Sequence, residues 1–71
     1  MNKGDKCWFW SAVADRNVGE ICDGVIADWP DNGPFASVQT TVRERPYTIF
    51  KNELFPTREA LCDHYRKVFE R

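Results

Sequence analysis

The sequence predicts a mainly β fold: a small antiparallel barrel or strongly bent sheet of four strands, with one C-terminal α-helix packed on it. Three observations lead to this prediction. Strand-forming stretches alternate with turn residues over the first fifty or so positions. The pattern changes to a helical period near residue 57, and 71 residues suffice for only one domain. We therefore expect a single domain, 1–71, in which the helix closes the open side of the sheet.

The first predicted strand covers residues 6–12, where side chains alternate between the two faces of a sheet. Cys7 and Phe9 fall on one face, and Trp8 and Trp10 fall on the other. Both faces are apolar, so this strand is either covered on both sides or presents aromatic rings outward.

The second predicted strand covers residues 20–29 and has Gly24 in its middle, where glycine often marks a bulge or a sharp bend. Residues 30–34, with the sequence PDNGP, predict the strongest turn of the chain. Asn-Gly accommodates a positive φ, and the flanking prolines cannot continue a ladder of hydrogen bonds. Alternation places Val25, Ala27 and Trp29 on one face of this strand and Cys22 and Ile26 on the other.

The third predicted strand covers residues 35–43. Its side chains alternate so regularly between two faces that one face should be buried and the other exposed to solvent. A turn at 43–46 leads into a short fourth strand at 47–51, with Tyr47 and Ile49 on one face. Short connections between consecutive strands favour an antiparallel meander. The face of the third strand expected to be buried consists of Ala36, Val38, Thr40 and Val42.

A helix is predicted over residues 58–70. Thr57 is a suitable N-cap, because its hydroxyl can accept a hydrogen bond from a free N–H of the first turn. Glu59 lies in that first turn, where the helix dipole favours a negative charge. The apolar stripe expected to pack on the sheet consists of Leu61, Tyr65, Val68 and Phe69.

Four short runs resemble the layout of small SH3-like barrels, the broad group that includes KOW, Tudor and bacterial SH3-like domains. They are KGDKCW at 3–8, GVI at 24–26, YTI at 47–49 and ELFPT at 53–57. The resemblance spans about residues 4–55 and concerns topology, since no diagnostic motif of the group is present and no member's binding residues carry over. It implies a module that binds peptides, proteins or nucleic acids and is seldom a catalyst.

The charges nearly cancel, at a net charge of −1. Because affinity for nucleic acid rests largely on neutralised phosphates, such binding would need the basic residues gathered on one face. The chain has three widely spaced cysteines, no signal-peptide core and no run of about 20 apolar residues. These features predict a cytoplasmic protein with reduced thiols that does not enter a membrane.

The sequence carries no catalytic or cofactor signature, so we expect neither an enzyme nor a cofactor. The only soft metal ligands are three cysteines and one histidine, and they lack the close pairs of a structural zinc site. Cys62 and His64 stand two positions apart on the predicted helix and therefore point in different directions. Cys7 and Cys22 are better explained as small buried apolar residues.

The aromatic residues offer a more specific hypothesis. If the helix covers Trp8 and Trp10, these rings are ordinary core. If at least one ring stays exposed, it can anchor a partner, because tryptophan and tyrosine are enriched at binding hot spots. Trp29 and Tyr47 are expected on neighbouring strands, where they would extend the same patch.

We therefore expect a non-enzymatic interaction module that binds another protein through Trp8, Trp10, Trp29 and Tyr47, as a monomer or weak dimer. Its size is typical of accessory factors, including those of bacteriophages and mobile elements. The alternative is a nucleic-acid-binding barrel in which a basic cluster beside Tyr47 contacts phosphates. A third option is a structural subunit that self-associates through an exposed apolar face. The basic cluster consists of Arg43, Arg45 and Lys51.

Overall fold

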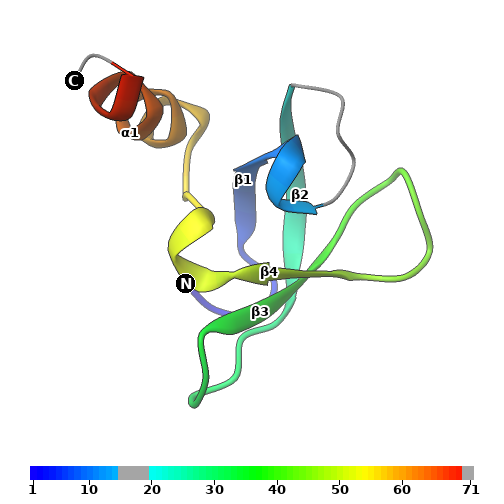
Figure 1. The fold of residues 1–71 in the computed structure, drawn as a ribbon. Coiled ribbons are helices and arrows are strands. Elements are labelled where there is room, and N and C mark those ends of the chain that lie inside the picture. Colours follow the sequence, from blue (N-terminus) through cyan, green and yellow to red (C-terminus); the bar gives the residue numbers. More distant parts are fainter. Residues whose placement is uncertain (15–19, 70–71) are drawn as a thin grey trace.

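A computed structural model describes residues 1–14 and 20–69 and, within them, every side chain except those of residues 14, 68 and 69. The described chain forms four strands, two short 3-10 helices and one α-helix (Figure 1). In chain order these are β1 (Lys6–Trp10), η1 (Ser11–Ala14), β2 (Ile21–Asp28), β3 (Phe35–Gln39), β4 (Tyr47–Phe50), η2 (Lys51–Glu53) and α1 (Arg58–Phe69).

The four strands form one antiparallel sheet in the order β1-β2-β3-β4, which confirms the predicted mainly β meander with a C-terminal helix. After β4 and η2 the chain returns to β1. Trp8 donates its N–H to the Phe55 carbonyl at 2.8 Å, and Phe55 donates to the Trp8 carbonyl at 3.0 Å. β1 is therefore bonded on both edges, by β2 on one side and by the Phe55 segment on the other.

Strand β2 is long, and its two halves pair with different neighbouring strands. It pairs with β1 from Ile21 to Val25, and with β3 from Val25 to Asp28. Gly24 lies where the partner changes, and a Cβ atom there would stand 2.7 Å from the Gln39 carbonyl oxygen. Glycine is needed at this position for the close approach of β3, whereas the shift in register lies between Ile26 and Asp28. Of the two alternatives expected at Gly24, a bulge or a sharp bend, the bulge lies a few residues further along β2.

Two strands end earlier than the alternation predicted. β1 stops at Trp10 because Ser11 bonds to Glu20: its N–H donates to the Glu20 carbonyl at 2.9 Å, and its hydroxyl accepts from the Glu20 N–H at 3.0 Å. β3 stops at Gln39, whose side-chain amide donates to the carbonyls of Thr40 and Arg43. The side-chain bonds of Gln39 are local, and bonds of this kind compete with a strand ladder.

Because β3 ends early, one residue expected inside lies outside. Val42 was assigned to the buried face of the third strand, but its side chain is 54% exposed in the turn that follows β3. The expected burial of Ala36, Val38 and Thr40 is confirmed. The third strand thus alternates as predicted only while it remains paired.

The core lies on the inner face of the curled sheet. Every strand contributes alternate side chains, and Leu54 adds one more from the segment after η2. Phe9, which is completely buried, packs against Tyr47 with the ring centroids 6.4 Å apart. The buried core residues are Cys7, Phe9, Cys22, Ile26, Ala36, Val38, Tyr47, Ile49 and Leu54.

The helix begins where it was predicted to, with the Thr57 hydroxyl accepting a hydrogen bond from the Ala60 N–H at 3.0 Å. Leu61 is buried, and Tyr65 contacts Trp10, whose side chain lies on the face of β1 opposite Phe9. The helix therefore packs on the outer face of β1 and does not cover the core side of the sheet (Figure 1). No helix among the described residues has the length and apolar character needed to cross a lipid bilayer.

Candidate functional site

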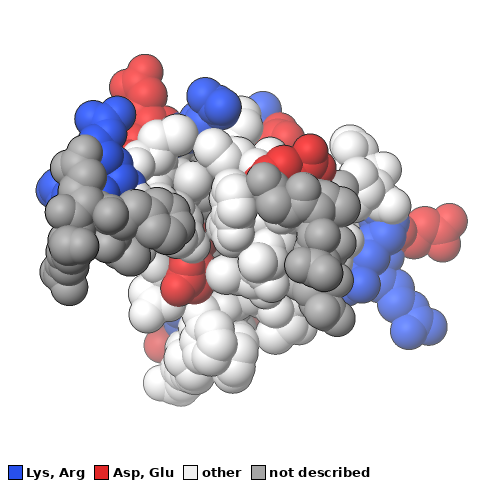
Figure 2. Space-filling view, turned by 45° about the horizontal axis from the view of Figure 1, so that its top comes forward, with Lys and Arg blue, Asp and Glu red and all other residues white. Residues whose placement is uncertain are grey.

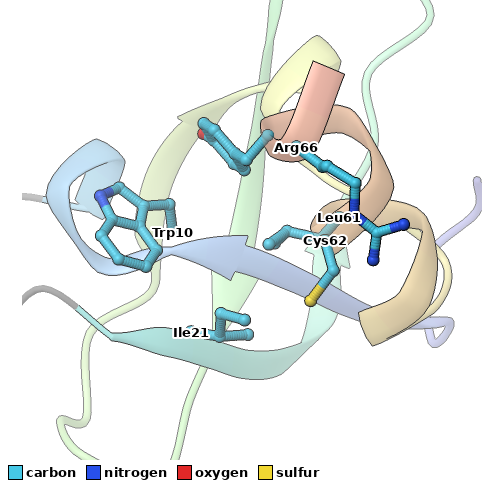
Figure 3. Close-up of a pocket in the computed structure, with 6 residues that line it drawn as sticks. Trp10, Ile21, Leu61, Cys62 and Arg66 are labelled. Atoms are coloured by element: carbon cyan, nitrogen blue, oxygen red, sulfur yellow. The ribbon is translucent and has the colours of Figure 1, made fainter. Parts of the chain in front are cut away.

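An apolar groove of about 330 Å³ lies between α1 and the adjoining ends of β1 and β2. Trp10 and Ile21 form its strand side, and Cys62 faces them from the helix (Figure 3). Its volume lies at the lower end of the range for small-ligand pockets. The lining residues are Trp10, Ile21, Leu61, Cys62, Tyr65 and Arg66.

The strand side of the groove follows from alternation and register. Because Phe9 points into the core, its neighbour Trp10 points outward. Trp10 stands directly opposite Ile21, and cross-strand neighbours of this kind pack side by side. Both side chains are half-buried, so they keep an exposed apolar surface that faces the helix.

The helix side is fixed by Tyr65. Its ring lies 6.0 Å from the ring of Trp10, and its hydroxyl donates a hydrogen bond to the Glu53 carboxylate at 2.9 Å. Burial, together with the hydrogen bond and the negative charge of Glu53, raises the pKa of Tyr65 to about 12. The bond joins α1 to η2 and holds the tyrosine ring at the mouth of the groove.

Ionisation of Tyr65 and Cys7 should weaken the fold at alkaline pH. Burial, with a smaller effect of the Asp23 charge, raises the pKa of the Cys7 thiol from 9.0 to about 11, and that of Tyr65 rises from 10.0 to about 12. Both groups ionise first in the unfolded chain, so their contribution is complete below pH 9 and disappears between pH 9 and 12. Urea unfolding from pH 8 to 11.5 should show a falling free energy of unfolding.

A matched variant separates the two groups. Tyr65→Phe should make the decline shallower above pH 10 and end it near pH 11, and it should leave the part between pH 9 and 11 that belongs to Cys7. A free energy of unfolding that stays constant from pH 8 to 11.5 in the unmodified protein would contradict both assignments.

Trp8 shares the outer face with Trp10 but is less accessible to a partner. Its backbone bonds to Phe55, and its half-buried ring lies 5.2 Å from the Lys6 ammonium. Lys6 is held in turn by the Asp23 carboxylate at 3.3 Å. Trp8 therefore extends the aromatic surface along β1 beneath a lysine, outside the groove itself.

The structure does not bring Trp29 and Tyr47 together with these residues. The strand that carries Tyr47 is separated from β2 by β3, so the expectation of neighbouring strands was wrong. Tyr47 is only 8% exposed, because its ring packs on Phe9 in the core. Trp29 is half-buried against the core, with the Lys51 ammonium 5.2 Å from its ring. Tyr47 therefore offers no exposed ring for stacking.

The three basic residues of the predicted cluster lie at two different places. The Arg43 guanidinium lies 3.7 Å from the Tyr47 ring centre and donates to the carbonyls of Arg45 and Pro46. Lys51 directly follows β4, whereas Tyr47 begins it. Four residues of extended strand therefore separate Lys51 from Tyr47 by about 13 Å. On the face seen in Figure 2, the Lys and Arg side chains lie at separate places near the outline and have acidic side chains close to them.

The three thiols differ in exposure. Cys7 and Cys22 are buried as expected, and the Cys7 thiol donates a weak hydrogen bond to the Gly24 carbonyl at 3.6 Å. Cys62 is half-buried in the groove wall, and His64 lies beside it in sequence, with its ring 5.1 Å from those of Phe55 and Tyr65. Within the described ranges, no three His, Cys, Asp or Glu side chains stand close enough to hold a metal ion.

One exposed aromatic pair was missed by the sequence prediction. Phe35 and Phe50 stand opposite each other on β3 and β4, with ring centroids 4.5 Å apart and exposed fractions of 43% and 49%. A signal was present, because the alternation that points Ala36 and Ile49 inward points both phenylalanines outward.

No protein-family model matches the chain, and no curated protein or solved structure matches it either. What the groove binds must therefore be inferred from the chemistry of its own side chains.

Proposed function

We propose that this protein is a non-catalytic binding module that holds another protein by an apolar side chain inserted into the groove between α1 and β1. The observation that carries the proposal is the apolar hollow between two half-exposed aromatic rings, those of Trp10 and Tyr65. A cavity with so few polar groups selects an apolar occupant, because a polar group placed there would lose its hydrogen bonds to water.

The composition of the groove favours a protein partner. Tryptophan, tyrosine and arginine are the residue types most enriched at binding hot spots, and Trp10, Tyr65 and Arg66 supply one of each. The bond between Tyr65 and Glu53 holds one wall in place before binding. Preorganisation of this kind lowers the entropy cost of association.

The resemblance to SH3-like barrels supports the same proposal. The chain forms an antiparallel meander, then a 3-10 turn after β4, and then a return to β1 at Phe55. The small barrels of the group that the sequence resembles serve mostly as binding modules. The groove proposed here is additional to that likeness, since it depends on α1.

The nucleic-acid alternative has less support. Arg43 already donates to two backbone carbonyls, Lys51 donates to the Pro30 carbonyl, and the Tyr47 ring is buried. Among the three cations, all within the described residues, Arg45 alone has an exposed side chain from which no hydrogen bond is described. Binding that weakens steeply with salt and is lost in Arg43→Glu/Arg45→Glu would favour this alternative instead.

A peptide library tests the groove directly. Short random peptides displayed on a surface are selected against the full chain, and the enriched peptides are then synthesised and titrated. We expect a shared aromatic or large aliphatic anchor, and we expect Trp10→Ala to weaken binding by about 30-fold, the effect of losing a hot-spot residue. Cys62→Phe, which fills the groove from the helix side, should have a similar effect.

Two controls make the result decisive. Val25→Ala removes an exposed apolar side chain that does not line the groove and should leave affinity unchanged. Urea unfolding of each variant checks that a loss of binding is not a loss of fold. If the selected peptides bind Trp10→Ala and Cys62→Phe as tightly as the parent protein, the groove is not the binding site.

A further inference from the structure

The outer surface of β3 and β4 presents a second aromatic feature, distinct from the groove. Phe35 and Phe50 are among the few large apolar side chains that the described chain leaves exposed, and they lie side by side. The groove uses β1 and α1, whereas this pair uses the opposite end of the sheet. We call it the phenylalanine pair.

Strand register explains why the two rings meet. The Lys51 N–H donates to the Pro34 carbonyl at 2.7 Å, so Pro34 and Lys51 form a hydrogen-bonded pair. In an antiparallel ladder the next pair, Phe35 and Phe50, is then of the non-hydrogen-bonded kind, in which the side chains stand closest. The sheet geometry itself therefore produces a stacked and solvent-exposed aromatic surface.

The polar groups beside the pair are acidic. Asp28 stands opposite Ser37, two residues from Phe35 on the same face, which makes Asp28 and Phe35 diagonal neighbours about 7–8 Å apart. Asp31 lies in the turn that leads to Phe35. Neither carboxylate is in an ion pair with another described residue.

The nearest lysine offsets only one of these two charges. The Lys51 ammonium donates to the Pro30 carbonyl and lies over the Trp29 ring, and it keeps its positive charge in both contacts. Two carboxylates and one ammonium thus leave a net negative charge beside the aromatic surface. An anionic ligand would be repelled here, and a cationic one attracted.

We propose that the phenylalanine pair and Asp28 form a docking surface for a basic segment of a partner protein, one that carries arginine or lysine. The aliphatic stems of such side chains cover aromatic rings while their charged ends remain in water. A guanidinium also gains from the faces of the rings and from the adjacent carboxylates. The surface is independent of the groove, so either proposal can fail alone.

The test uses two matched probes. One is a blocked peptide of alternating arginine and serine, and the other replaces arginine by citrulline, which has nearly the same shape and no charge. In a titration followed by amide chemical shifts, the arginine peptide should shift the resonances of Phe35, Phe50 and Asp28 saturably. The citrulline peptide should bind at least tenfold more weakly.

Variants then identify the surface. Phe35→Ala/Phe50→Ala and Asp28→Asn should each weaken binding of the arginine peptide by about tenfold. Glu44→Gln, a neutralised exposed acid on another turn, and Trp10→Ala, in the groove, should leave it unchanged. Circular dichroism of each variant confirms that it is folded.

Three results would overturn the proposal. The first is an absence of saturable shifts at these residues. The second is equal binding of the arginine and citrulline peptides. The third is undiminished binding to the folded Phe35→Ala/Phe50→Ala variant, which would reduce the effect to general charge attraction. Tighter binding of a single-stranded oligonucleotide at the same residues would likewise overturn the proposal, because it would show that the surface accepts anions.

Discussion

Replacing Phe9 by alanine is expected to lower the free energy of unfolding by about 3–5 kcal/mol. Phe9 is completely buried, lies next to the last residue of β1 and packs on Tyr47 of β4, at the other end of the strand order. A chain of 71 residues has a total stability of about 4–11 kcal/mol. The substitution therefore removes about a quarter or more of the stability.

The measurement is urea unfolding followed by tryptophan fluorescence and circular dichroism. Phe50→Ala is the matched control, because it removes the same side chain from a half-exposed site. Its loss should be about 1 kcal/mol, mostly from the contact with Phe35. Equal losses at the two positions would show that the core does not lie on the Phe9 face.

Substitutions of Gly24 are expected to destabilise the sheet in proportion to side-chain size. A Cβ atom at this position would stand 2.7 Å from the Gln39 carbonyl oxygen and 2.8 Å from a methyl group of Val38. Since the first contact is backbone, β3 itself has to move. Gly24→Ala should cost about 1–3 kcal/mol, as overpacking usually does, and Gly24→Val should cost more.

Gly33 provides the contrasting case. Its φ is +91° and no atom stands within 4 Å of the position of an added Cβ. Gly33→Ala should therefore cost about 1 kcal/mol through backbone conformation alone, and Gly33→Asn should cost less, since asparagine tolerates positive φ. Urea midpoints of the four variants compare the two mechanisms. A Gly24 series without dependence on size would contradict the close approach of β3.

Much of the fold was predictable because the signals were local. The turn at 30–34 depends on Asn-Gly and its flanking prolines, and Gly33 does adopt the expected positive φ. The N-cap at Thr57 likewise depends on neighbouring residues. So does the placement of Cys7 and Phe9 on the same face of β1. Each of these features was confirmed.

The errors came from interactions between distant residues. The end of β1 depends on Ser11 bonding to Glu20, nine residues further along the chain. The placement of the helix depends on Tyr65 reaching both Trp10 and Glu53. An amphipathic stripe shows that a helix packs on something, but not on which face of the sheet.

The candidate site likewise combines features set by neighbouring residues with features set by distant ones. Alternation placed Trp8 and Trp10 on one face but left open whether the helix covers them; in the structure Trp10 lies on the outer face, half-buried against Tyr65. Tyr47 was assigned to the patch because strand order was not known, and the structure buries it. The groove combines residues near position 10, near 21 and between 61 and 66, which no sequence window contains.

The bridge between Trp8 and Phe55 has a consequence for how the protein is made. On a ribosome β1 is synthesised before the Phe55 segment, so its second edge stays open until that segment emerges. Contacts between residues far apart in the sequence also form slowly. Until the closure forms, the backbone edge of β1 is available to chaperones or to unwanted strand pairing.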